Sequence, residues 1–285
     1  MGRAKWKELT DEQIQTVIEN YVVKKQGLAT CGKEFGLTQK VVETLLKDNN
    51  IHKRTYTEAK QEGRKYTCND NFFKYQNSNM AYILGLIASD GSISSKENLI
   101  TIELLNKDKE ILEKIKEITK SSRDIKDYIK KSTNQNISKF CVWSKSWKED
   151  LKRYNIVPNK TFILQPPTFL DDKFFPDFLR GFFDGDGSIS KRKYGNVFEI
   201  ACASKPMIDW FIEKLSNTYG IPCQYSSYEI INGKMYKFFI GKSFLLPKIY
   251  NLLYQNNPEL FLTRKKEKFN SLVKIPRDSN TSVEV

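Results

Sequence analysis

Residues 82–94 read YILGLIASDGSIS, and residues 178–190 repeat the pattern as FLRGFFDGDGSIS. The last five residues are identical in the two copies, and Asp186 follows Asp90 by 96 residues. A glycine also recurs at the same place in the apolar run of each copy. Self-similarity of this kind predicts one structural unit that the chain uses twice.

The elements expected after each copy have the same order. Periodicity and turn residues predict a strand, a helix, two strands and a helix after the first copy, at 99–105, 107–119, 125–131, 139–143 and 145–154. The same elements are predicted after the second copy, at 197–203, 206–219, 224–231, 234–240 and 244–255. Asn232-Gly233 predicts a type I′ hairpin turn between two of these strands. Each half is therefore expected to be an αββαββα unit, which makes the fold class α+β.

The region before residue 76 lies outside the repeat and predicts three short helices. Residues 9–25 have helical periodicity, residues 28–35 form a second helix, and Thr38 is a candidate N-cap after a turn at Gly36. This order is typical of a small all-α helix-turn-helix module, although three-helix bundles also dock proteins. In a DNA-binding module, the residues that face the major groove would be Thr38, Gln39, Lys40, Glu43 and Lys47.

Composition narrows the classes of partner and of chemistry. The chain has 47 Lys and Arg against 34 Asp and Glu, which gives a net charge of +13. This charge favours a polyanionic partner such as nucleic acid, with a merely solubilising surface as the alternative. The five cysteines form no Cys-x-x-Cys pair, and the single histidine, His52, excludes mechanisms that need two imidazoles. A catalytic metal would therefore need oxygen ligands.

The domain organisation follows from these patterns. We expect a helix-turn-helix domain at 1–51, a basic linker at 52–75, the two halves at 76–170 and 171–275, and a disordered tail at 276–285. Lys53 and Arg54 in the linker would either be solvated or lie along DNA. No apolar run approaches the roughly 18 residues that span a membrane, and the first residues lack the apolar stretch of a signal peptide. No membrane partner is expected, and the expected location is the cytoplasm.

Each Asp-Gly pair is expected to end a helix, with the glycine just after the C-cap. A carboxylate there faces the negative end of the helix dipole, which is unfavourable unless a cation is near. Two such helices can pack closely through small residues spaced four apart, namely Gly85, Ser89, Gly181 and Gly185. This packing would bring Asp90 and Asp186 together, where a hard divalent cation such as Mg²⁺ would relieve their repulsion. The sequence thus predicts a metal-dependent phosphodiesterase centre.

The two copies also resemble a known family. Residues 83–91 (ILGLIASDG) and 179–187 (LRGFFDGDG) resemble the paired motif of LAGLIDADG homing endonucleases, and the flanking repeats extend the resemblance over roughly residues 72–273. The resemblance implies a pseudo-symmetric monomer in which the paired motif helices form the interface. It also implies that the strands form a saddle on double-stranded DNA. One departure is the sixth motif position, which holds Ala88 in the first copy and Asp184 in the second.

The resemblance assigns roles to individual residues. It implies that Asp90 and Asp186, beside Gly91 and Gly187, bind Mg²⁺ or Mn²⁺. It also implies a basic residue near each scissile phosphate, for which Lys160 and Lys265 fit, with Lys266 as the alternative to Lys265. The residues that position water in relatives would be Asn106 and Ser204.

The DNA-reading residues would be polar side chains on the saddle strands. The candidates are Lys130, Lys139, Lys191, Arg192, Lys193, Gln224, Tyr225, Tyr228, Lys234 and Lys237. The expected function is a site-specific homing endonuclease, encoded by a bacterial or phage mobile element, that makes a metal-dependent double-strand break. The alternative is a non-cleaving regulator or splicing maturase on the same fold. Such decayed relatives lose the acidic pair, which this chain keeps.

Overall fold

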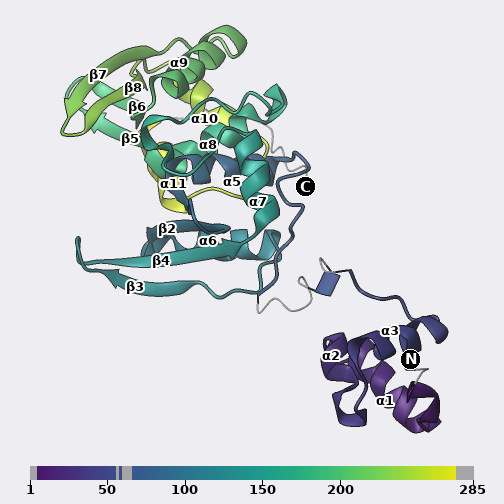
Figure 1. The fold of residues 1–285 in the computed structure, drawn as a ribbon. Coiled ribbons are helices and arrows are strands. Elements are labelled where there is room, and N and C mark those ends of the chain that lie inside the picture. Colours follow the sequence, from purple (N-terminus) through teal and green to yellow (C-terminus); the bar gives the residue numbers. More distant parts are fainter. Residues whose placement is uncertain (1–4, 56–57, 60–65, 274–285) are drawn as a thin grey trace, which may run out of the picture. The chain divides into compact units, whose positions relative to one another are not determined.

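The computed structural model describes residues 5–55, 58–59 and 66–273 (Figure 1). The chain forms two compact units, Met1–Thr67 and Cys68–Val285. The predicted tail at 276–285 lies outside the described residues. Within the described part of the chain, no helix is long and apolar enough to cross a membrane.

The first unit contains the three helices that the sequence predicts. They are α1 (Asp11–Val22), α2 (Leu28–Cys31), which the short 3-10 helix η2 (Lys33–Phe35) continues, and α3 (Gln39–Asp48). Gly36 has a φ of 63°, so it makes the left-handed turn before α3 that favours glycine. Val17, Val42 and Leu45 are fully buried, so each of the two longer helices contributes its apolar face to one small core.

The predicted linker at 52–75 is too long at both ends. Arg54 packs on the first unit, where its backbone N–H donates to the Tyr21 hydroxyl at 2.7 Å and its guanidinium lies 4.1 Å from the centre of the Tyr21 ring. Phe72 and Phe73 are buried in the core of the second unit, against Trp147. Aromatic contacts, which a count of polar residues does not reveal, therefore extend both units toward each other in sequence.

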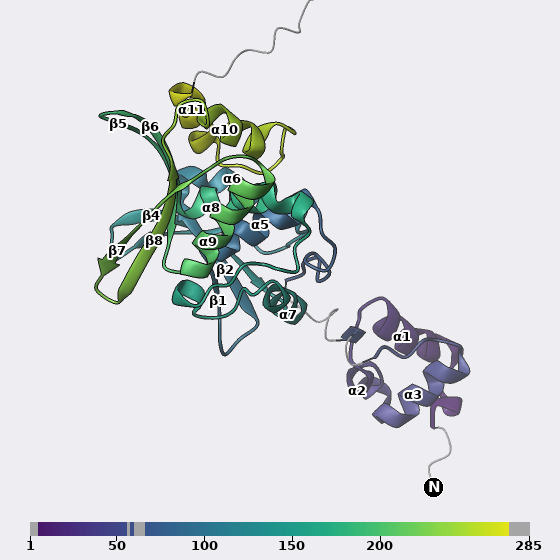
Figure 2. The same ribbon diagram turned by 90° about the horizontal axis from the view of Figure 1, so that it is seen from above.

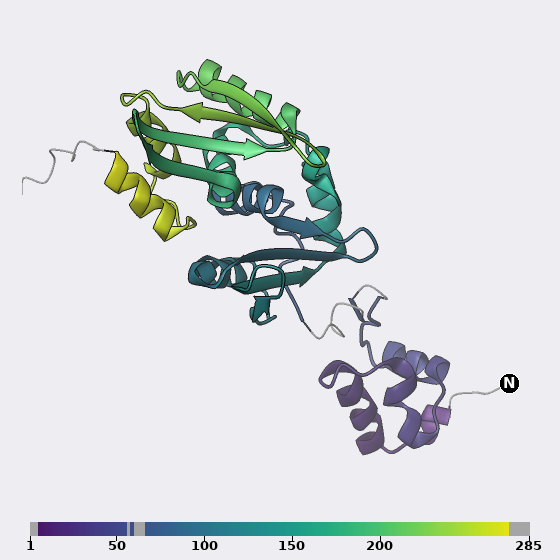
Figure 3. The same cartoon turned by 90° about the vertical axis from the view of Figure 1, so that its left-hand side faces the viewer.

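The second unit is a duplicated α+β fold, as predicted. Its first half contains, in order, α5 (Ser78–Ser89), β1 (Gly91–Ile93), β2 (Leu99–Leu105), α6 (Lys109–Ile118), β3 (Lys126–Lys130), β4 (Gln135–Trp143) and α7 (Lys145–Arg153). Its second half contains α8 (Phe175–Asp186), β5 (Gly187–Arg192), β6 (Gly195–Cys202), α9 (Lys205–Glu213), β7 (Gln224–Ile230), β8 (Gly233–Ile240), α10 (Leu246–Tyr254) and α11 (Thr263–Leu272). Helix α11, which lies beside the edge of the sheet at β5 (Figure 3), follows α10 as an eighth element.

Each half contributes one antiparallel sheet with the same topology. Sheet A has the strand order β1-β2-β4-β3, and sheet B has the order β5-β6-β8-β7. Side chains alternate between the two faces of a strand, so each sheet has one face covered by helices and one uncovered face. Phe140 of sheet A and Phe198 and Phe238 of sheet B are buried on the helix-covered face. The opposite, uncovered face carries Lys139 and Glu199, and Figure 2 shows the strands along one side of the unit with the helices behind them.

Helices α5 and α8 pack through two equivalent glycines. A Cβ on Gly85 would lie 2.1 Å from the carbonyl oxygen of Phe178, and a Cβ on Gly181 would lie 2.0 Å from that of Tyr82. Tyr82 and Phe178 occupy the same position in the repeat, so the contact is pseudo-symmetric. Only glycine permits this approach of the two backbones, and the approach fixes where the two helices end.

One sequence prediction about a turn is wrong. The β7–β8 turn is not type I′, because that turn needs positive φ at both central residues, and the hairpin has a positive φ only at Gly233. Gly91 directly follows the C-cap Asp90, as predicted, whereas Gly187 is itself the C-cap of α8, and neither glycine has a left-handed φ. They are needed for space, since a Cβ would lie 2.6 Å from Ile87 Cα in one copy and 2.3 Å from Phe183 Cδ2 in the other.

Candidate active site and DNA-facing surface

The paired helices bring Asp90 and Asp186 to the same end of the helix pair. Asp90 is the C-cap of α5, and Asp186 is the last residue of α8. An added Cβ on Gly185 would lie 3.2 Å from Asp90 Oδ2, so the Asp90 carboxylate lies against the last turn of α8. Both aspartates keep part of their surface exposed to solvent, although neighbouring protein atoms partly desolvate the carboxylates. The chain therefore presents two carboxylates at one solvent-accessible point.

The two carboxylates influence each other electrostatically. The surrounding protein atoms raise the pKa of Asp186 to about 6, and the negative charge of Asp90 adds to this shift. Burial also raises the pKa of Asp90, while the positive charges of Lys265 and Lys160 lower it. Neighbouring like charges that raise a carboxyl pKa are the arrangement that a bound cation relieves.

The side chain of Lys265, a residue of α11, extends to the C-terminal end of α8. Its ammonium donates to the carbonyls of Phe183, Asp184, Gly185 and Gly187 at 2.6, 2.7, 3.1 and 2.7 Å. Burial lowers the pKa of Lys265 to about 8, and the charge of Asp184 opposes this, so the ammonium form predominates at neutral pH. A buried cation at this end neutralises the negative end of the helix dipole.

Lys160 lies at the equivalent end of α5. It begins the 3-10 turn η4 (Lys160–Phe162) and donates to the carbonyl of Gly91 and, at 3.5 Å, to that of Ser89. Burial lowers the pKa of Lys160, and the charges of Asp186 and Asp90 oppose this. The two lysines lie on different elements, because Lys265 lies inside α11 whereas Lys160 begins a 3-10 turn. Lys266 is not at this centre, since its ammonium lies 4.2 Å from the Phe261 ring centre.

The donor set of this centre fits a hard divalent cation. Among the described residues, no group of three or more His, Cys, Asp or Glu side chains could hold a metal ion. Such a cation would be held by Asp90 and Asp186, with water, phosphate or backbone oxygens in the other positions. Mg²⁺ at phosphate-handling sites is commonly held by one or two carboxylates and the substrate. The predicted ligands Gly91 and Gly187 instead offer carbonyls that accept hydrogen bonds from the two lysines.

Asp184, which has no counterpart in the first motif, links the two halves. Its Oδ2 accepts from the Tyr82 hydroxyl at 2.8 Å and from the Leu262 backbone N–H at 2.7 Å. Leu262 is the N-cap residue of α11, so Asp184 holds the start of the helix that carries Lys265. The reciprocal positions hold Ala88 in the first half and Phe178 in the second, and neither side chain can make these bonds.

A second contact between the halves lies next to Lys265. Arg264 donates to both oxygens of Asp108 in a bidentate pair, at 2.7 Å from Nε to Oδ1 and 2.8 Å from Nη2 to Oδ2. Asp108, just before α6 of the first half, is buried. Paired guanidinium and carboxylate groups are directional, so this contact fixes α11 against the first half.

A comparison with known families identifies the family to which this pair of motif helices belongs. Residues 77–158 and 177–235 match the model of the LAGLIDADG-like domain. Each matched segment includes one copy of the motif and one of the two acidic residues. The chain belongs to the LAGLIDADG family.

Several known proteins are similar to this LAGLIDADG chain. An uncharacterized protein of Methanocaldococcus jannaschii is 27% identical over 202 residues, which cover 64% of this chain and 70% of that protein. Full-length DUF199/WhiA from Thermatoga maritima has a TM-score of 0.46 at 17% identity, covering 72% of this chain and 64% of that chain. This chain thus spans less than two thirds of its length. I-DmoI in complex with DNA and Ca has a TM-score of 0.46 at 14% identity, covering 71% of this chain and 99% of that chain.

Strand register assigns each predicted saddle residue of the LAGLIDADG unit to a face. Because partners in register share a face, the uncovered face carries Lys130, Lys139, Arg192, Gln224, Tyr228 and Lys237. Three candidates point the other way, namely Lys191, Tyr225 and Lys234, which share their face with buried residues such as Ile189 and Phe238. Lys193 lies in the β5–β6 turn. The structure therefore places six of the ten candidates on the uncovered faces of the two sheets.

Two acidic residues on the uncovered face escaped sequence reasoning. The Glu103 carboxylate forms an ion pair with the Lys139 ammonium at 3.0 Å. The Glu199 carboxylate forms one with the Arg192 guanidinium at 2.7 Å and lies 3.6 Å from the Lys237 ammonium. Glu103 and Glu199 lie 96 residues apart, like the two motif aspartates, so the repeat itself was the signal that could have identified them. They hold basic side chains in place on both sheets.

The residues proposed to position water have other contacts. Asn106 donates to the Ser138 hydroxyl at 3.0 Å. Ser204 is buried and caps α9, where its hydroxyl accepts from the Met207 backbone N–H at 3.3 Å. The assignment of Ser204 is wrong, because its side chain is committed to the helix cap.

In the first unit, α3 carries the predicted groove-facing residues. Thr38, Gln39, Lys40 and Lys47 are exposed. Glu43 accepts from Gln39 at 3.2 Å and from Lys53 at 2.8 Å, which places Lys53 beside α3. Arg54 differs, since its guanidinium lies over Tyr21 and donates to the Lys25 carbonyl at 3.2 Å. The Arg54 guanidinium is therefore engaged within the first unit.

Proposed function

We propose that this chain is a site-specific DNA endonuclease that hydrolyses one phosphodiester in each strand of a duplex. The observation that carries the proposal is the pairing of Asp90 and Asp186 at the joined ends of α5 and α8, each with a lysine beside it. Two uncovered, basic sheet faces belong to the same unit. A net charge of +13 favours a polyanion over a small neutral substrate.

In the proposed mechanism, the uncovered faces bind the duplex and the motif aspartates meet its backbone. Asp90 and Asp186 would hold the cation, and Mg²⁺ bound there would act as a Lewis acid toward the phosphodiester and a water molecule. The side chains on sheets A and B would set the register of the duplex, and bases would be read by polar groups such as Gln224 and Arg192. Lysine charge at the centre would stabilise the charge that develops on phosphorus oxygens.

We further propose that the first unit is a helix-turn-helix DNA-binding module. Its α3 presents Gln39, Lys40 and Lys47 on an exposed face, with Lys53 held beside them by Glu43. The left-handed turn at Gly36 precedes this helix, as expected of a recognition helix. The chain would act as a monomer, because it already contains both motif helices.

The experiment that tests the endonuclease is plasmid cleavage by the full chain. Plasmids carrying DNA from the gene's own genomic neighbourhood are incubated with Mg²⁺ or Mn²⁺, against EDTA and against the Asp90→Asn and Asp186→Asn variants. Metal-dependent linearisation at one site, lost in both variants while DNA binding persists, is the expected result. The variants keep nearly the same shape, so loss of cutting reports on the charge.

The second candidate function is a DNA-binding protein that does not cleave. The observation in its favour is that both lysines donate to motif carbonyls, so cations already lie at the two helix ends. Tight, specific DNA binding with no cutting in either metal would select this function over the endonuclease.

A further inference from the structure

We propose that the two lysines of the motif centre have different roles: Lys265 is a structural cation, whereas Lys160 is the lysine that contacts a scissile phosphate. This inference rests on the proposed endonuclease function. It predicts that the two strands of the target are cut at different rates.

Lys265 has no donor left for a substrate. The residue is 8% exposed, and its ammonium has four carbonyl oxygens within 3.1 Å. An ammonium has only three N–H groups, so these acceptors occupy all of them. A phosphate could bind Lys265 only if it replaced bonds that hold the last turn of α8.

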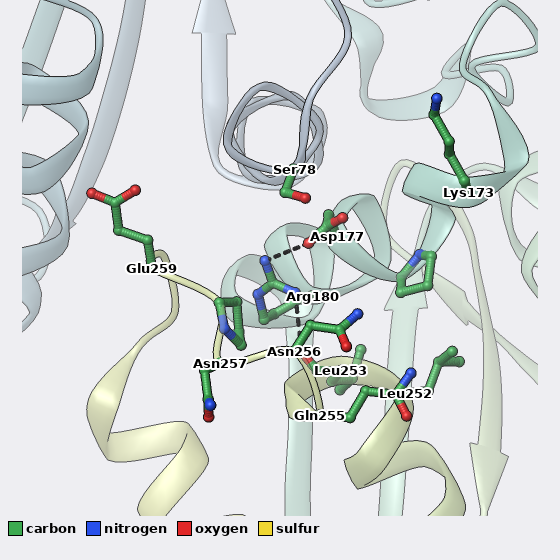
Figure 4. Close-up of a pocket in the computed structure, with 12 residues that line it drawn as sticks. Ser78, Lys173, Asp177, Arg180, Leu252, Leu253, Gln255, Asn256, Asn257 and Glu259 are labelled. Carbon is green, nitrogen blue, oxygen red and sulfur yellow. Dashed lines mark hydrogen bonds and ion pairs between the residues drawn. The ribbon is translucent and has the colours of Figure 1, made fainter.

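Buried polar groups fix the chain that leads to Lys265. Arg180 donates to the carbonyl of Leu253 at 3.0 Å and pairs with Asp177 at 2.8 Å (Figure 4). It also donates to the carbonyl of Leu260 at 2.8 Å. Asp184 then holds the N–H of Leu262. These contacts position the segment between α10 and α11 before the helix begins.

The bidentate contact of Arg264 with Asp108 holds the first turn of α11 from the other side. Lys265 therefore follows a segment that is hydrogen-bonded at Leu253, Leu260, Leu262 and Arg264. A side chain anchored in this way has little freedom to move toward a ligand.

Lys160 lacks this support. The repeat positions that correspond to Arg180 and Asp184 are Leu84 and Ala88, which form no hydrogen bonds through their side chains. Lys160 is half-buried on a three-residue 3-10 turn, and one of its two acceptors is 3.5 Å away. At least one of its N–H groups is therefore available, beside the carboxylates of Asp90 and Asp186.

The test compares Lys160→Met, Lys265→Met and Lys265→Gln with Lys268→Met, which removes an exposed lysine from α11. A DNA duplex is first selected from a random pool by binding to the full chain. Three quantities are then measured: the Tm without DNA or metal, the salt dependence of binding to this duplex, and the cutting rate of each labelled strand.

We expect Lys265→Met to lower the Tm by roughly 5–10 °C, because four carbonyls lose a buried cation. Lys160→Met should change the Tm by less than about 2 °C, reduce the salt slope by about one, and slow one strand at least about 100-fold. Lys265→Gln keeps an amide donor, so it should leave the salt slope at the value for Lys268→Met.

Two results would overturn the inference. One is an equal fall in salt slope for Lys160→Met and Lys265→Gln, and the other is an equal fall in Tm for the two methionine variants. If the wild-type chain binds but does not cut, the endonuclease proposal fails, while Tm and salt slope still decide the roles of the two lysines. If no duplex is selected, DNA binding fails and the phosphate contact of Lys160 fails with it.

Discussion

The two halves of the LAGLIDADG unit share their backbone geometry and differ in their buried polar groups. Both have the glycine that joins α5 to α8, the terminal Asp-Gly, and the sheet order. At three repeat positions the first half has Tyr82, Leu84 and Ala88, where the second has Phe178, Arg180 and Asp184. The repeated residues therefore set the common geometry, and the residues that diverge serve one half alone.

The divergent residues act together because they meet across the pseudo-dyad. Tyr82 of the first half donates to Asp184 of the second, whereas the reciprocal pair, Phe178 and Ala88, is apolar. Only the second half has an additional helix after its seven repeated elements, namely α11, and Asp184 anchors this helix through Leu262. A duplicated fold can thus keep its symmetric interface while one half acquires a polar network that orders an additional helix.

The largest effect is expected where the halves are alike. Gly85→Ala and Gly181→Ala each place a Cβ about 2 Å from a backbone oxygen of the other helix, and backbone cannot move aside as a side chain can. Each should lower the free energy of unfolding by about 3 kcal/mol or more. Urea denaturation measures this, with Gly241→Ala as the control, because its Cβ would meet only Val197 Cγ2 at 3.7 Å.

The symmetry of the interface predicts that these two alanine variants are destabilised to a similar degree. A difference of more than about 1.5 kcal/mol between them would show that the glycine contacts are not equivalent in energy. In that case the helix interface would be symmetric in its backbone geometry but not in its contribution to stability.

A smaller effect is expected where the halves differ. Tyr82→Phe removes a donor from the buried Asp184 carboxylate and should cost about 2 kcal/mol. Tyr75→Phe is the control, because Tyr75 is exposed and its hydroxyl loss should cost little. In a double-mutant cycle, Tyr82→Phe and Asp184→Asn should couple by about 1 kcal/mol. Additive effects would mean that the hydroxyl and the carboxylate act independently.

The acidic pair predicts a pH dependence of cation binding. Asp186 must be ionised to hold a cation, and its pKa is raised to about 6 by burial and by Asp90. The rise in Tm on adding Mg²⁺ should therefore be several degrees near pH 7.5 and should shrink as the pH falls below about 6.

Without the metal, the same raised pKa makes the folded protein less stable as the pH increases. A carboxyl whose pKa is raised on folding binds more protons in the folded state, so its ionisation costs stability above about pH 6 and that cost disappears on acidification. Asp186→Asn should abolish the Mg²⁺-dependent rise at both pH values. A rise that is independent of pH in the wild type would place the cation elsewhere.

Most of the second unit could be predicted from the sequence because the repeat is local and periodic. The identical residues 90–94 and 186–190 located both motif ends, and apolar periodicity located the helices and strands that follow. The β7–β8 turn was missed because Asn-Gly favours type I′ only when both residues adopt positive φ, and the register centres the turn one residue earlier. The pairing register of β7 and β8, rather than the local preference of Asn-Gly, therefore determines which residues form the turn.

The candidate site was predictable in its residues and less so in its contacts. Nothing local indicates that Tyr82 meets Asp184 or that Arg264 meets Asp108, since 102 and 156 residues separate the partners. Alternation along a strand also needs a phase, and buried partners such as Phe238 supply it only once strands are paired. Lys191 and Lys234 were therefore grouped with residues of the opposite face.

The smallest effect compares two lysines on one strand. In β8, Lys237 lies on the uncovered face, whereas Lys234 shares the face of Phe238 and pairs with Glu229 at 3.4 Å. If the uncovered face binds the DNA backbone, Lys237→Ala should lower the slope of log affinity against log salt by about one, and Lys234→Ala should leave it unchanged. Both variants remove one positive charge, so net charge cannot cause a difference between them. Equal slopes for the two variants would mean that the duplex does not distinguish the faces of sheet B, and the strand register would then no longer identify the DNA-facing surface.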